Sequence, residues 1–236
     1  AFFGGSSGTL NKITGDFVQN YVKSNNNGYG GAIAAYQSGT LGEMNGNFYQ
    51  NYVDVTNDGY GGAIYIQYAG APFNKMNGAF TENYVKSGND GYGGAVYAKY
   101  AGVTQNATID FVRNYIQAKN NAFGGAVYIA YSGGYNNLTG LFLENYAYSE
   151  NASAYGGALY MGQGGNLTNL NAIFKDNYVS AHNSAYGGAL YLDYNATIIG
   201  GAFLNNHADS ETGDSKGGAI YFNGQYDMPL NLFAKD

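Results

Sequence analysis

Cysteine and tryptophan are absent from this 236-residue chain, and proline occurs only twice. The lack of cysteine excludes a disulfide framework and thiolate zinc sites. Charge is also scarce, at 11% of residues, with a net charge of −6. The ten basic residues form no cluster, which argues against nucleic acid as a partner. No apolar run approaches the ~18 residues of a membrane-spanning helix, so membrane insertion is not expected.

Glycine and tyrosine are abundant instead, at 38 and 26 residues. Hydrophobic residues make up 45% of the chain, which is enough for a packed core, so the low charge does not indicate disorder. Glycine shows no three-residue period, which excludes a collagen helix.

The decisive feature is an internal repeat carried by two motifs. Phe-x-x-Asn recurs every 29–32 residues, with its Phe at 17, 48, 80, 111, 142, 174 and 203. Gly-Gly-Ala followed by Ile, Val or Leu recurs every 30–32 residues, beginning at 30, 61, 93, 124, 156, 187 and 217. Because two independent motifs keep one phase, we predict a single continuous domain over 1–236. Its repeats are approximately 1–29, 30–60, 61–92, 93–123, 124–155, 156–186 and 187–216, with a partial coil at 217–236.

Each unit predicts three short strands separated by Asn- and Gly-rich corners. The first begins at Gly-Gly-Ala, the second precedes the Phe, and the third runs from the Phe to the Tyr-Val pair. The expected fold is all-β: a single parallel β-helix (β-solenoid) of about seven coils of ~31 residues, with the right-handed crossover usual for parallel strands.

Alternation along the strands assigns columns to the two faces. An Asn column is expected inside as a hydrogen-bonded structural ladder: Asn20, Asn51, Asn83, Asn114, Asn145, Asn177 and Asn206. One Tyr column is expected outside: Tyr65, Tyr97, Tyr128, Tyr160, Tyr191 and Tyr221. A second is Tyr21, Tyr52, Tyr84, Tyr115, Tyr146 and Tyr178, with His207 at its end. These columns are either a face for binding or lateral contact, or exposed strand residues that simply stack.

Charges test this register. The charges of adjacent coils alternate in sign through Glu82, Arg113 and Glu144, and again through Lys23, Asp54 and Lys86. The pair Glu144 and Asp176 breaks the alternation. Such alternation is expected where neighbouring rungs touch.

The repeated motifs, exemplified by Gly30-Gly31-Ala32-Ile33 and Phe17-Val18-Gln19-Asn20, resemble the passenger domains of chlamydial polymorphic membrane proteins and related β-helix surface proteins. The resemblance covers almost the whole chain. It implies a β-helix exposed at a cell surface, secreted by an autotransporter route and used for adhesion.

Catalytic chemistry is not expected, and neither is a cofactor or a metal. The nearest acidic group is Asp209, Glu211 and Asp214 with Lys216, which we interpret as solvated corner residues. His182 and His207 are the two histidines, and His207 only replaces a Tyr in its column. The Asp58 and Asp90 loops could hold a weak ion, but turn chemistry explains them more simply.

Both ends of the chain look like interrupted coils. Phe233 to Asp236 resembles an eighth Phe-x-x-Asn motif, and Ala1 to Gly5 resembles the corner at 122–125. We therefore expect an extracellular or cell-surface structural subunit of a filament, whose partners are copies of itself stacked head to tail. The competing explanation of the interrupted ends is that the chain is a piece of a longer solenoid. The alternative is a cell-surface adhesin that binds glycans through its outward tyrosines. A carbohydrate-active enzyme is the least expected function.

Overall fold

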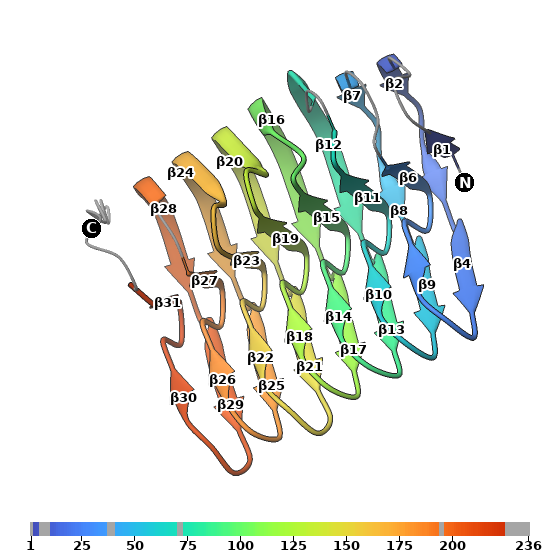
Figure 1. The fold of residues 1–236 in the computed structure, drawn as a ribbon. Coiled ribbons are helices and arrows are strands. Elements are labelled where there is room, and N and C mark those ends of the chain that lie inside the picture. Colours follow the sequence, from blue (N-terminus) through green and yellow to red (C-terminus); the bar gives the residue numbers. More distant parts are fainter. Residues whose placement is uncertain (1, 5–9, 37–40, 70–72, 194–195, 225–236) are drawn as a thin grey trace.

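The computed structural model describes residues 2–4, 10–36, 41–69, 73–193 and 196–224. These residues form strands, turns and bends without a helix, and the strands pair in parallel into four sheets. The chain advances through about six turns of about 31 residues, from the blue N-terminal coil to the red C-terminal coil (Figure 1). The predicted parallel β-solenoid is thus confirmed, while its handedness stays a prediction. The Phe233–Asp236 motif lies outside the described residues.

Sheet A contains the strands that follow each Gly-Gly pair. They are β1 (Phe2–Gly4), β6 (Ile33–Tyr36), β11 (Ile64–Gln67), β15 (Val96–Lys99), β19 (Val127–Ala130), β23 (Leu159–Met161), β27 (Leu190–Leu192) and β31 (Ile220–Phe222).

Sheet B contains the longest strands, which end just after the motif Phe. They are β2 (Leu10–Thr14), β3 (Phe17–Val18), β7 (Leu41–Asn45), β8 (Phe48–Tyr49), β12 (Lys75–Thr81), β16 (Val103–Val112), β20 (Gly134–Leu143), β24 (Asn166–Lys175) and β28 (Ala196–Leu204).

Sheet C holds the Tyr-Val strands and sheet D the two-residue strands before each Gly-Gly pair. Sheet C contains β4 (Tyr21–Ser24), β9 (Tyr52–Val55), β13 (Tyr84–Ser87), β17 (Tyr115–Ala118), β21 (Tyr146–Ser149), β25 (Tyr178–Ala181) and β29 (His207–Ser210). Sheet D contains β5 (Gly28–Tyr29), β10 (Gly59–Tyr60), β14 (Gly91–Tyr92), β18 (Ala122–Phe123), β22 (Ala154–Tyr155), β26 (Ala185–Tyr186) and β30 (Ser215–Lys216).

The prediction of three strands per coil was wrong, because each coil contributes strands to four sheets. The motif Phe ends the sheet B strand, and the Tyr-Val pair begins a new strand in sheet C. The residue before each motif Asn separates them, because its φ lies between 52° and 56°, in the left-handed region that breaks a strand. These residues are Gln19, Gln50, Glu82, Arg113, Glu144, Asp176 and Asn205. The fourth strand, in sheet D, lies in the segment that the sequence pattern assigned to a loop.

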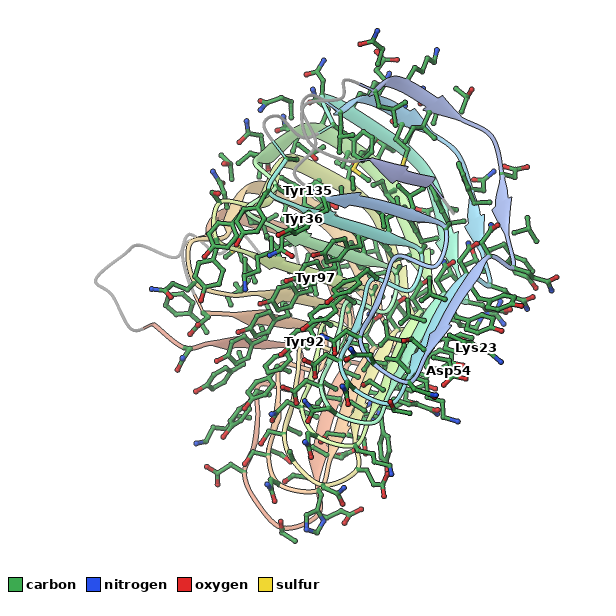
Figure 2. All side chains as sticks on the ribbon, turned by 45° about the vertical axis from the view of Figure 1, so that its right-hand side comes forward. Lys23, Tyr36, Asp54, Tyr92, Tyr97 and Tyr135 are labelled. Carbon is green, nitrogen blue, oxygen red and sulfur yellow. The ribbon has the colours of Figure 1, made fainter. Side chains whose placement is uncertain are left out.

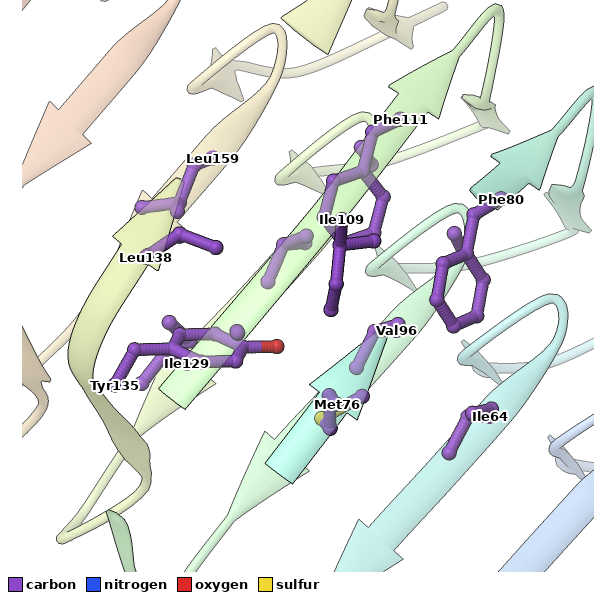
Figure 3. Close-up of a cluster of buried hydrophobic side chains, with 14 of the residues drawn as sticks. Ile64, Met76, Phe80, Val96, Ile109, Phe111, Ile129, Tyr135, Leu138 and Leu159 are labelled. Atoms are coloured by element: carbon purple, nitrogen blue, oxygen red, sulfur yellow. The ribbon is translucent and has the colours of Figure 1, made fainter. Parts of the chain in front are cut away.

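Two separate cores fill the coil. The larger lies between sheets A and B and contains a ladder of Phe rings whose centroids lie 4.4–5.1 Å apart. Figure 3 shows Phe80 and Phe111 in this core with Ile64, Val96 and Ile109. The smaller core lies between sheets C and D and is built from Val, Ile and Ala. Large side chains therefore separate sheets A and B, and small ones hold sheets C and D together.

The two glycines of each Gly-Gly pair have different roles. The first, such as Gly61 with φ 59°, takes a left-handed conformation that turns the chain from sheet D into sheet A. At the second, such as Gly94, a Cβ would lie 2.0 Å from the carbonyl oxygen of Gly125 in the next coil. It would also lie 2.5 Å from the carbonyl oxygen of Tyr115 across the coil. The pair is thus both a tight corner and a close backbone approach.

The charge columns have the predicted register. Asp54 pairs in sheet C with Lys23 on one side and Lys86 on the other. Arg113 Nε lies 3.7 Å from Glu82 Oε1 and 4.0 Å from Glu144 Oε2.

The N-terminal segment differs from the prediction. Phe2 pairs with Ile33 and Phe3 with Ala34, so β1 continues sheet A instead of forming a Gly-Gly corner. The pairing follows backbone register, which short sequence similarity to the corner at 122–125 does not capture.

Candidate functional site

The asparagine ladder lies inside the coil, as predicted. Asn51, Asn83, Asn114, Asn145 and Asn177 are fully buried. In each rung, the backbone N–H and one side-chain N–H donate to Oδ1 of the Asn in the following coil, at 2.9–3.0 Å for Asn83 to Asn114. The other side-chain N–H donates backward, as from Asn114 to the carbonyl oxygen of Phe80 at 2.8 Å. The buried amides are thus satisfied, and the ladder has one direction.

The tyrosine column that starts at Tyr21 lies on the outer face of sheet C. Tyr21 is 59% exposed, and Tyr52 to Tyr178 are half-buried. Successive rings stack with centroids 4.8–5.1 Å apart and planes within 10° of parallel. Partial burial, with the neighbouring phenols, raises the pKa of Tyr84 to about 12. Because each ring covers the face of the next, this column presents mainly ring edges and hydroxyl groups to solvent.

The tyrosine column that starts at Tyr65 is not exposed, which corrects the sequence-based expectation. Tyr65, Tyr97, Tyr128 and Tyr191 are less than 9% exposed, and Tyr160 is half-buried. These residues do point away from the main core, as the alternation requires, but they form a separate buried cluster. Burial raises the pKa of Tyr97 well above its usual value. Alternation predicts which side of the sheet a residue occupies and not what covers that side.

The cover is a third aromatic column, in sheet D, which the sequence reasoning missed. It consists of Tyr29, Tyr60, Tyr92, Phe123, Tyr155 and Tyr186. Tyr92 contacts Tyr97 and Tyr128 edge-on, at centroid distances of 6.2 and 5.3 Å. Figure 2 shows Tyr92 beside Tyr97. The signal was present in the sequence, because an aromatic residue precedes six of the seven Gly-Gly pairs. It was overlooked because that segment was interpreted as a loop.

A groove follows the corner where the outer faces of sheets D and A meet. Its floor is the buried Tyr65 column, one wall is the Tyr29 column, and the other includes Tyr68, Tyr100 and Tyr131. A pocket of about 540 Å³ lies at its N-terminal end and a smaller one of about 220 Å³ lies further along. Gln67 lines both pockets, so they belong to one groove.

The acidic group near the C-terminal coil does not converge on one point. Lys216 Nζ lies 2.7 Å from Asp214, His182 Nδ1 2.8 Å from Glu211, and His207 Nε2 3.6 Å from Asp209. The hydrogen bond to Asp214 raises the pKa of Lys216. The geometry therefore agrees with the interpretation as solvated corner residues. The expectation that the chain is not an enzyme stays a prediction.

The corner loops use their carboxylates in turn contacts. Asp58 accepts a hydrogen bond from Asn89 in the next coil at 2.6 Å, and Asp90 accepts one from the backbone of Asn121 at 2.8 Å. Among the described residues, no three His, Cys, Asp or Glu side chains are grouped as a metal site would require.

The comparisons with known proteins agree with the motif analysis. The model of the Chlamydia polymorphic membrane protein (Chlamydia_PMP) repeat matches residues 197–223, which hold the last Phe-x-x-Asn and Gly-Gly-Ala motifs. The chain resembles the chlamydial polymorphic membrane proteins. No curated protein and no solved structure matches it.

This repeat and the solenoid together suggest a surface-exposed, autotransporter-like passenger. They point to an outer-membrane or surface protein. Within the described residues, the structure has no helix with the length and apolarity needed to span a membrane.

Proposed function

We propose that this solenoid is the structural subunit of a surface fibre that grows by head-to-tail stacking. The proposal rests on the directional asparagine ladder. From Asn51 to Asn177, every rung donates to the next Asn and back to the preceding coil, so a second copy can extend the ladder only in the same orientation. Such a contact is heterologous and does not close, which is the geometry of a filament.

Stacked copies would continue the parallel sheets at the usual spacing of ~4.8 Å between strands.

Electron microscopy of the purified protein tests this function. We expect unbranched fibres. Phe222→Lys places a charge at the inner face of the last sheet A strand and should prevent growth without unfolding the coils. Tyr100→Lys, a charge on the lateral face, is the matched control and should leave fibre length unchanged. Monomers alone at high concentration would contradict the proposal.

A second candidate is an adhesin that binds glycans through tyrosines. The tyrosine-lined groove favours it, because aromatic walls with hydroxyl groups suit amphipathic ligands. A glycan array that compares the protein with an unfolded sample tests this function, and binding of no glycan would exclude it.

A further inference from the structure

One position interrupts the buried tyrosine column. Ala34 occupies in β6 the register position that Tyr65 occupies in β11, and Tyr follows in every later strand of sheet A. The other members of the column lie 4.9–5.3 Å from their neighbours, so one ring is missing at this point.

The missing ring leaves Tyr29 with fewer partners. Tyr60 contacts two rings of the floor edge-on, Tyr65 and Tyr97, at 6.2 and 5.2 Å. Among the described rings of the floor, Tyr29 contacts only Tyr65 in this way, at 5.0 Å, and Ala34 stands where the second ring would be. Tyr29 is also the first described ring of its column and stacks on Tyr60 alone, and it is 41% exposed, whereas Tyr60 stacks between Tyr29 and Tyr92 and is half-buried.

The pocket of about 540 Å³ lies at this position. Its volume falls within the ~300–1,000 Å³ of small-molecule sites. Its aromatic walls include Tyr29, Tyr36 and Tyr68, with Tyr65 at the floor. The amides of Asn27 and Gln67 add neutral donors and acceptors, and Asn27 Nδ2 donates to the Tyr29 hydroxyl at 3.3 Å.

The lack of charged side chains in this pocket favours a neutral ligand. None of the described residues that line this pocket is charged, in contrast to the Lys- and Glu-lined hollow on sheet C. Burial also raises the pKa of Tyr65 well above its usual value, so the surroundings disfavour negative charge. The Tyr29 hydroxyl accepts from Asn27 and can still donate, and Gln67 accepts from the Tyr65 hydroxyl and can still donate through its amide. A purely aromatic ligand would make no use of these donors. A sugar ring offers an apolar face for the rings and hydroxyl groups for the polar atoms.

We propose that the Ala34 pocket binds one ring of a neutral glycan, whose chain continues along the groove toward Gln67. This inference rests on the second candidate function and names its site. The ring takes the place of the missing tyrosine beside Tyr29.

The test uses the whole chain and a panel of neutral oligosaccharides: cello-, xylo-, malto- and chito-oligosaccharides, with sialylated and uronic-acid glycans for comparison. Binding is measured by saturation-transfer NMR and titration calorimetry. Ala34→Tyr restores the residue found in six other strands of sheet A, so it should fill the pocket and keep the fold. We expect at least a tenfold loss of affinity for the neutral glycan, with an unchanged or higher melting temperature. Tyr21→Ser, on sheet C, is the matched control and should bind as the wild type does.

A second variant tests the site by a gain of binding instead of a loss of binding. Tyr160→Ala creates the same vacancy between Phe123 and Tyr155 and should raise the stoichiometry from one site to two. Equal binding by the wild type and Ala34→Tyr would overturn the site but leave glycan adhesion standing, as would binding of charged glycans alone. The absence of any glycan binding would overturn both the site and the second candidate function.

Discussion

At the residue scale, the second glycine of the Gly-Gly pair shows how a single Cβ atom decides whether neighbouring coils can stack. At Gly94, a Cβ would meet two backbone carbonyl oxygens within 2.5 Å, and neither is the end of a flexible side chain. Gly218 occupies the same position in the last described corner, where the nearest atom, the Asn206 carbonyl oxygen, is 3.3 Å from a Cβ.

We therefore predict different costs for the same substitution at these two sites. Gly94→Ala should lower the free energy of unfolding by about 3 kcal/mol or more, the upper range for overpacking. Gly218→Ala should change it by less than ~1 kcal/mol. Urea denaturation followed by circular dichroism measures both, and equal losses would refute the close-approach argument.

The asparagine ladder gives a second residue-scale prediction. Asn114→Ala removes the acceptor of the Asn83 backbone N–H and the donor to the Phe80 carbonyl oxygen. Because each buried group left without a partner costs about 1–3 kcal/mol, the loss of stability should be about 2–6 kcal/mol. Asn25→Ala, at an exposed corner position, is the control and should be nearly neutral. Thermal melts measure both variants. Equal melting temperatures would show that the ladder does not contribute to stability.

At the element scale, the strands of sheet A and sheet D stabilise each other through their tyrosines. In sheet A alone, the Tyr65 column would be exposed, as the alternation of side chains along a strand suggests. The corner formed at the first glycine brings the sheet D column over it, so two outward faces cover each other. Outer-face aromatic residues thereby act as a third core.

This buried aromatic cluster predicts a stability that depends on alkaline pH. Burial raises the pKa of Tyr97 and Tyr160 above that of an unfolded phenol, near ~10. The unfolded chain therefore releases these protons first, so the stabilisation is complete below pH ~10 and is lost as pH rises through the folded pKa.

Absorbance at 295 nm with parallel circular dichroism measures this effect. A fraction of the 26 tyrosines should stay protonated at pH 11 and ionise together with the loss of β structure. In 6 M guanidinium chloride, all should titrate near pH ~10. Complete ionisation of the folded protein by pH 11 would contradict the buried column.

At the scale of the whole molecule, each coil contacts mainly its two neighbours, so the stack behaves as a one-dimensional array. Sheets A to D run in coil order, and all the ladders advance by one repeat at each step. Length can therefore change by whole coils without a change of fold.

Deletion of a coil tests this property. Removal of residues 93–123 joins Tyr92 to Gly124 and keeps every column in phase, so the protein should fold with one coil fewer. Removal of 93–108 deletes about half a coil, breaks the phase and should abolish cooperative folding. Circular dichroism and limited proteolysis compare the two, and similar behaviour of both deletions would count against the array description.

The sequence by itself determined the parallel solenoid, its phase and most of its inner columns. Identical residues at a fixed spacing, such as the Phe and Asn of each motif, stabilise a stack only when they lie one above another. The register of Lys23, Asp54 and Lys86 followed from the same reasoning. Local alternation also placed the Tyr65 column correctly on the side away from the main core.

The tertiary structure alone decided the number of strands and what covers the outer faces. The left-handed residue before each Asn divides one expected strand into two, and nothing in Gln19 or Arg113 as residue types announces that conformation. The direction in which the Gly-Gly corner folds sheet D toward sheet A brings Tyr29 and Tyr60 over the Tyr65 column. This contact joins residues on either side of a corner. The alternation of side chains along a strand does not specify the angle of that corner. The Ala34 pocket lies between Tyr29 of sheet D and Tyr65 of sheet A, so it depends on a contact between two sheets that the repeat in the sequence does not specify.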